Sequence, residues 1–191
     1  MSRPVLQVIA ASTRPGRRGI AVAHWLQRFA EEHGGFEIEL IDLAEVGLPL
    51  FDEPRHPRLQ QYAHQHTKDW SARVSRADAF VFVTPEYNHS FPASLKNALD
   101  YLSLEWADKP VGLVSYGGVS AGLRAATALK PVLAALRMVP VVEAVSIPFF
   151  AEHIDADGEF TPSIQTEGGG KAMLDELLRL ATVLRGLRET A

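Results

Sequence analysis

The chain has 191 residues, 47% hydrophobic and 22% charged, with 19 Lys and Arg against 23 Asp and Glu and hence a net charge of −4. This length suits one domain whose core needs no metal or disulfide for stability, and the mildly acidic balance argues against nucleic-acid binding. No cysteine is present, which excludes disulfides, thiolate nucleophiles and thiol redox couples, so any redox chemistry would depend on a bound cofactor.

Five segments are predicted to be strands. In chain order they are Val5–Ala10, Phe36–Asp42, Ala79–Val83, Val111–Ser115 and Val139–Val145. Four are short, continuous apolar runs, which is typical of strands buried on both faces. The second alternates apolar and charged residues, which predicts a strand with one exposed face at a sheet edge.

Helical patterns separate and follow these strands, at Gly19–His33, Leu59–Ala77, Ser94–Leu102, Leu123–Met138 and Lys171–Leu187. Pro131 is expected to bend or split the fourth helix. The last helix follows Gly168-Gly169-Gly170, interpreted as a flexible stretch.

Alternating strands and helices predict an α/β fold over residues 1–191 as a single domain. The expected architecture is a flavodoxin-like three-layer sandwich, with a five-stranded parallel sheet of order 2-1-3-4-5 and helices on both faces. No targeting signal and no membrane-spanning run is visible, so we expect a soluble, cytoplasmic protein without membrane partners. Ligands of such sheets lie beyond the carboxyl ends of the strands, which directs attention to the loops after strands one, three and four.

The loop after the first strand brings hydroxyl, guanidinium and glycine residues to the start of a helix. It reads Ala11-Ser12-Thr13-Arg14-Pro15-Gly16-Arg17-Arg18-Gly19-Ile20. Guanidinium groups match phosphate geometry, glycines allow the backbone to approach an anion, and a helix N-terminus offers unpaired N–H groups. These features favour a phosphate site over a solvated basic loop. The loop is neither the Gly-x-Gly-x-x-Gly fingerprint nor a P-loop.

The loop after the third strand, Thr84 to Pro92, suits a planar heterocycle. Tyr87 and Phe91 offer flat apolar surface, and Asn88 offers an amide edge. The alternative is a structural turn that caps the following helix.

The loop after the fourth strand contains Ser115-Tyr116-Gly117-Gly118, where paired glycines permit close backbone approach. Gly118-Val119-Ser120-Ala121-Gly122 also matches the Gly-x-Ser-x-Gly nucleophile elbow, so a serine hydrolase using Ser120 is an alternative. It is disfavoured because only His153 follows Ser120, and because two residues separate the pentapeptide from the strand.

Together the three loops resemble the NAD(P)H-dependent FMN reductase family of flavodoxin-like proteins, whose relatives include quinone, azo-compound and chromate reductases. The resemblance runs from about Val5 to Phe150. It is carried mainly by Pro85–Asp100, which is similar to the family's Pro-Glu-Tyr-Asn segment and its Leu-Lys-Asn-Ala-x-Asp continuation. Ser12–Arg17 is similar to the family's Ser-x-Arg-x-x-Arg phosphate loop, although Ala11 stands where many members have Gly.

The resemblance implies that FMN is bound. Its phosphate would be held by Ser12, Arg14, Arg17, Gly19 and Ile20. Its isoalloxazine would be lined by Pro85, Glu86, Tyr87 and Asn88, and on the other edge by Ser115, Tyr116, Gly117 and Gly118.

The implied reaction passes hydride from NADPH or NADH to flavin N5 and then to a small acceptor such as free flavin, a quinone or another electrophile. No side-chain acid or base is obligatory, so no catalytic residue is assigned. The resemblance also implies a homodimer or homotetramer. Arg18 receives no role, and His89 is either a surface residue or a nicotinamide contact.

Two further expectations remain. A flavodoxin-like electron carrier without NAD(P)H turnover is a second alternative, although such carriers tend to be strongly charged. No metal site is expected, because His64 and His66 are two residues apart and would not share a helix face.

Overall fold

The computed structural model, which describes residues 3–189, has five parallel strands in one sheet of order β2-β1-β3-β4-β5. The strands are β1 (Val5–Ala10), β2 (Glu37–Asp42), β3 (Ala79–Pro85), β4 (Pro110–Tyr116) and β5 (Val139–Ile147). The predicted order is therefore confirmed. Residues 1–2 and 190–191 of the predicted domain lie outside the described residues.

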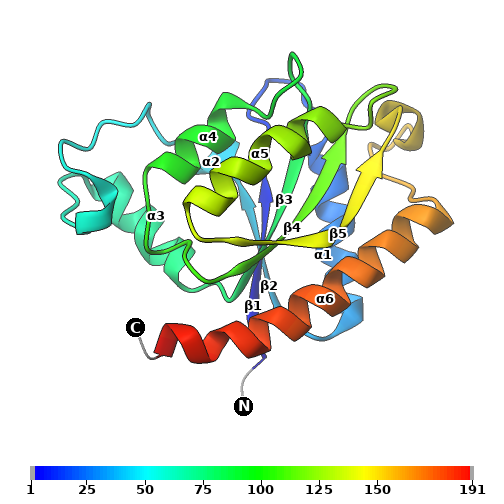
Figure 1. The fold of residues 1–191 in the computed structure, drawn as a ribbon. Helices are drawn as coiled ribbons and strands as arrows, with labels where there is room; N and C mark the ends of the chain where they lie inside the picture. Colours follow the sequence, from blue (N-terminus) through cyan, green and yellow to red (C-terminus); the bar gives the residue numbers. More distant parts are fainter. Residues whose placement is uncertain (1–2, 190–191) are drawn as a thin grey trace.

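Helices cover both faces of the sheet (Figure 1). The longer ones are α1 (Ile20–His33), α3 (Gln65–Ser75), α4 (Ala93–Asp100), α5 (Leu123–Ala135) and α6 (Ile164–Glu189). The short elements are α2 (Leu43–Val46) and two 3-10 turns, η1 (Pro57–Leu59) and η2 (Phe150–His153).

Two hydrophobic cores lie between these layers. Side chains of α1 and α6 pack with one face of the sheet, and side chains of α3, α4 and α5 pack with the other. Strand β1 contributes to both, because successive side chains of a strand point to opposite faces. Its Leu6 and Val8 join the first core, and its Ile9 joins the second.

The predicted helix Leu59–Ala77 begins later than expected. Residues Pro57–Leu59 form only the turn η1, which ends at Gln60 with a φ of 50°. The Glu53 carboxylate then accepts from the backbone N–H groups of Ala63 and His64, at 2.8 and 3.0 Å. These hydrogen bonds satisfy the backbone N–H groups of the two residues just before α3, which starts at Gln65.

The interpretation of Gly168-Gly169-Gly170 as a flexible stretch is wrong, because α6 already begins at Ile164. A Cβ on Gly170 would lie 3.1 Å from the ring of Phe29, so a side chain hardly fits between α6 and α1 here. Tertiary packing thus outweighs the low helix propensity of glycine. Pro131 lies within α5, which remains one helix and is not split.

The two sheet edges differ in burial. Strands β3 and β4 are buried along their whole length, as predicted. Strand β5 was expected to be buried on both faces, but it is an edge strand with an irregular register opposite Val111 and Leu113. Val142 is 91% exposed there, which corrects that expectation.

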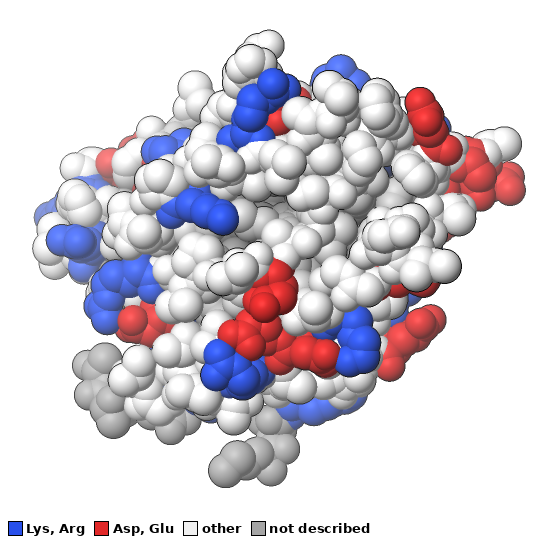
Figure 2. Space-filling model, turned by 45° about the vertical axis from the view of Figure 1, so that its right-hand side comes forward, with Lys and Arg blue, Asp and Glu red and all other residues white. Residues whose placement is uncertain are grey.

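On the face shown in Figure 2, Lys and Arg side chains are interspersed with Asp and Glu and do not form one large patch. Within residues 3–189, no helix is long and apolar enough to cross a membrane.

Candidate functional site

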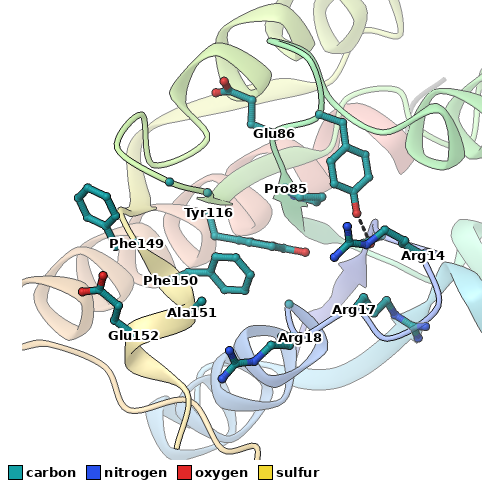
Figure 3. A pocket seen from close by; sticks show the side chains of 15 residues that line it. Arg14, Arg17, Arg18, Pro85, Glu86, Tyr116, Phe149, Phe150, Ala151 and Glu152 are labelled. Atoms are coloured by element: carbon teal, nitrogen blue, oxygen red, sulfur yellow. Dashed lines mark hydrogen bonds between the residues drawn. The ribbon is translucent and has the colours of Figure 1, made fainter.

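A cavity of about 470 Å³ lies at the carboxyl ends of the central strands (Figure 3). Its lining comes from the loops that follow β1, β3, β4 and β5. Ten of the predicted site residues meet around it: Ser12, Arg14, Arg17, Gly19, Pro85, Glu86, Tyr87, Tyr116, Gly117 and Gly118. These positions are far apart in the sequence, and the parallel sheet brings them to one edge.

The three arginines of the first loop have different environments and do not crowd one another. Arg17 forms an ion pair with Asp42, whose side chain is only 9% exposed and also caps α2 through the Ala44 N–H. Arg18 donates to the carbonyl of Ile154 at 3.1 Å. Arg14 lies at the cavity, where its exposed guanidinium is available to an anion.

The Nε of Arg17 is buried and has no hydrogen-bond partner among the described residues. A buried, unpaired donor is costly in free energy, and the guanidinium of Arg17 is directed to Asp42.

The N-terminus of α1 faces the same cavity. Its N-cap is Gly19, which lines the cavity, and the first turn of α1 has neither an acidic residue nor a side-chain cap. The positive end of the helix dipole is therefore uncompensated locally, as at helix termini that bind phosphate. A Cβ on Gly19 would lie 1.9 Å from the Tyr116 hydroxyl, so only glycine fits this approach.

The second loop forms a tight turn. Tyr87 and Ser90 exchange two backbone hydrogen bonds, at 2.9 and 3.0 Å. Between them, Asn88 and His89 both have positive φ, 49° and 67°, as a two-residue hairpin turn requires. Tyr87 reaches back to the first loop, where its hydroxyl lies 2.7 Å from Ser12 Oγ.

Three predicted site residues do not line the cavity. Ile20 packs against the core shared with α6, and Asn88 is exposed at the tip of the turn. Ser115 is buried and donates to the Ala121 carbonyl at 2.9 Å, so it shapes the third loop from below.

A fourth loop, after β5, was missed by the sequence reasoning. Phe149, Phe150, Ala151 and Glu152 line the cavity, as does Arg18. The N–H groups of Phe149 and Phe150 donate to Gly118 and Gly117, at 3.1 and 3.2 Å. The signal that could have found it was the place of β5 beside β4, because neighbouring parallel strands end at the same edge.

The aromatic part of the cavity is formed mainly by Tyr116 and Phe150, whose ring centroids are 4.7 Å apart. Burial raises the pKa of Tyr116 above its ordinary value, so its hydroxyl remains protonated at neutral pH. Cationic and helix-terminal donors at one end and aromatic walls at the other fit a phosphorylated planar group such as FMN. The cavity size is within the usual range for small-molecule sites.

Ser120 is not arranged as a nucleophile. Its hydroxyl donates to the Glu86 carboxylate at 3.2 Å, and not to a histidine that could act as a base. The serine hydrolase alternative therefore lacks the geometry that nucleophilic serine needs.

Comparison with known proteins gives a consistent result. The model of the NADPH-dependent FMN reductase family matches residues 5–152. The NAD(P)H-dependent FMN reductase C4B3.06c of Schizosaccharomyces pombe is 40% identical over 149 residues, which are 76% of this chain and 74% of that protein. The NAD(P)H-dependent FMN reductase LOT6 of Saccharomyces cerevisiae is 35% identical over 142 residues, 69% and 74% of the two chains.

Among solved structures, FerB from Paracoccus denitrificans, a flavoenzyme NAD(P)H:(acceptor) oxidoreductase, superposes with a TM-score of 0.74 at 25% identity. The alignment covers 94% of this chain and 97% of FerB. The flavodoxin-like fold is thereby shown, and the serine hydrolase and electron-carrier alternatives are set aside. The chain belongs to the NADPH-dependent FMN reductase family and is an FMN-dependent oxidoreductase that uses NAD(P)H.

Proposed function

We propose that the cavity at the carboxyl edge of the sheet is the FMN site, with the phosphate at the N-terminus of α1. Arg14 would bind the phosphate, Arg17 would add positive charge beside it, and Ser12 would contribute its hydroxyl. The observation that supports this most strongly is the convergence of an uncapped helix terminus, two arginines and two aromatic loops on one cavity.

The isoalloxazine would lie between the second and third loops. Pro85 and Tyr87 form one side, and Tyr116, Gly117 and Gly118 form the other. The glycines leave room for backbone N–H groups to approach the ring, and the prolines of the second loop restrict its motion. The chain would thus bind and orient the cofactor, which supplies hydride chemistry between NAD(P)H and the acceptor.

The acceptor would enter through the open side bordered by Phe149, Phe150 and Glu152. Phe149 is half exposed and offers flat apolar surface, which suits a planar electrophile. Free flavin and quinones are therefore the acceptors that we propose to test first.

Flavin titration tests the site. Purified protein should bind FMN more tightly than riboflavin, because riboflavin lacks the phosphate. Anaerobic NADPH should then bleach the flavin absorbance. Equal affinity for the two flavins would contradict the phosphate assignment, and absence of bleaching would contradict reductase activity.

We also propose that residues 1–191 form a single domain that assembles as a homodimer or homotetramer and acts in the cytoplasm, where NAD(P)H is available. Leu50, Phe51 and Leu59 support self-association, because they are 82%, 41% and 57% exposed within one segment. Analytical ultracentrifugation would measure the assembly, and a monomer at micromolar concentration would contradict it.

A further inference from the structure

The side chain of Glu86 turns away from the cavity that its backbone lines (Figure 3). This carboxylate is only 6% exposed. It accepts hydrogen bonds from the guanidinium Nε of Arg124 at 2.5 Å, the backbone N–H of Arg124 at 3.2 Å and the hydroxyl of Ser120 at 3.2 Å. All of these donors belong to the third loop or the first turn of α5, so the contact joins two segments distant in sequence.

Helix α5 needs this carboxylate at its start. Its N-cap is Gly122, which provides no side-chain cap, and its first turn contains no acidic residue. Arginine in a first turn is unfavourable beside the positive end of the helix dipole. Glu86 supplies both the missing acceptor and the compensating charge from another loop.

The same carboxylate is held in its ionised form. Burial alone would raise the pKa of Glu86, but the hydrogen bonds from Arg124 and Ser120 outweigh burial and lower the pKa below its ordinary value. Removal of the Arg124 side chain would leave this buried carboxylate with only the Ser120 hydroxyl and the backbone N–H of residue 124 as donors, which is unfavourable.

The contact also lies directly behind the cavity walls. Pro85 and Tyr87, on either side of Glu86, line one wall, and Gly117 and Gly118 line the other. The backbone N–H of Glu86 further donates to the Tyr116 carbonyl at 3.3 Å. Backbone and side chain of one residue therefore tie the two walls together.

We propose that Arg124 is a positioning residue which, with Ser120, fixes Glu86 and thereby sets the spacing of the two loops that flank the isoalloxazine. This inference rests on the proposed function, since it assumes that the flavin lies between these loops. It also gives Ser120, within its Gly-x-Ser-x-Gly pentapeptide, a structural role in place of a nucleophilic one.

A double-mutant cycle tests this role. Arg124→Met and Glu86→Gln should each raise the FMN dissociation constant about tenfold, and the double variant should be no worse than the poorer single variant. Arg124→Lys should recover part of the loss. Arg179→Met is the matched control, because Arg179 pairs with Glu176 on the exposed side of α6 at 2.6 and 2.8 Å, and its effect should stay within about twofold.

Hydrogen exchange of the flavin-free protein provides a second readout. Arg124→Met should speed exchange in peptides covering residues 86–90 and 117–122, while peptides of β1 and α6 stay protected. Unchanged FMN affinity with unchanged exchange would overturn the proposal, as would additive effects in the cycle. If the wild type fails to bind FMN, the proposed function fails. Hydrogen exchange of Arg124→Met still decides whether Arg124 holds the second and third loops together.

If Arg124→Met does not fold, Arg124→Lys and Ser120→Ala take its place in both measurements. Ser120→Ala removes one of the hydrogen bonds and should raise the FMN dissociation constant severalfold. Wild-type affinity in both of these variants would equally overturn the proposal.

Discussion

Replacement of Gly19 by alanine perturbs the site with a single methyl group. The backbone of Gly19 has φ −66° and ψ −12°, which alanine adopts without strain. Gly19 is the N-cap of α1, where glycine is preferred over alanine, so helix propensity offers the substitution no gain. The obstacle is tertiary, because the new Cβ would lie 1.9, 2.2 and 2.6 Å from three atoms of the Tyr116 ring and hydroxyl.

The size of the loss in stability depends on which atoms can move to relieve this clash. Tyr116 is 4% exposed and its ring packs on Phe150, so the hydroxyl can move only into the cavity. Overpacking of this kind costs about 1–3 kcal/mol. Since no propensity gain offsets this cost, we expect Gly19→Ala to lower the free energy of unfolding by roughly 1–3 kcal/mol, or about 2–12 °C in Tm. The displaced ring should also weaken FMN binding.

Urea denaturation of the flavin-free protein and FMN fluorescence titration measure the two effects. Gly168→Ala is the matched control, since Gly168 lies inside α6 and a Cβ added there would meet nothing within 4 Å. That variant should be stabilised by up to about 1 kcal/mol, with unchanged FMN affinity. If Gly19→Ala behaves like Gly168→Ala in both assays, the close approach of Gly19 to Tyr116 is refuted.

Three further outcomes are expected. Arg14→Ala should weaken FMN binding by about 1.5–3 kcal/mol but leave riboflavin affinity unchanged in the same titration, and equal losses for both flavins would contradict a phosphate contact. Burial, with nearby Arg188, lowers the pKa of Lys109 to about 8. The unfolded chain therefore keeps a proton that the folded chain has lost, and the free energy of unfolding should rise by about 1 kcal/mol from pH 8 to pH 9, below the range in which the buried tyrosines, whose pKa values are raised, oppose it. In urea denaturation, Lys109→Met should show a smaller rise in the free energy of unfolding over this pH range. An equally steep rise in the variant would mean that another group causes it. A fluorophosphonate probe should leave Ser120 unlabelled, and labelling would revive the hydrolase alternative.

The sequence predicted the sheet because its signals are local and strong. Strands β1, β3 and β4 are mostly apolar and mostly buried, and the alternation in β2 marks an edge. The apolar run of β5 was misleading about burial, because the run itself does not reveal how many neighbours a strand has. Gly168–Gly170 was misjudged for a related reason, since only the packing of α6 on α1 explains a helix there.

The candidate site shows the same contrast between local signals, which the sequence carries, and tertiary contacts, which it does not. Three loops could be found from motifs, because glycines, arginines and prolines at strand ends carry specific backbone and charge requirements. The pairing of Arg17 with Asp42 could not, because it joins the first loop to the end of β2. Asp42 thereby offsets one of the three arginine charges of the first loop, through a contact that exists only in the folded chain.

The fourth loop forms a separate wall of the cavity that we propose as the FMN site. The family match ends at residue 152, inside the turn η2 that forms this wall of the cavity. Phe149 and Phe150 carry no phosphate-binding or backbone-specific signal, yet their N–H groups are fixed to Gly118 and Gly117 of the third loop. These hydrogen bonds join backbone atoms only, so the attachment of this wall to the third loop does not depend on the two side chains. With FMN placed as we propose, the side chains of this wall would therefore affect the choice of acceptor more than the binding of the cofactor.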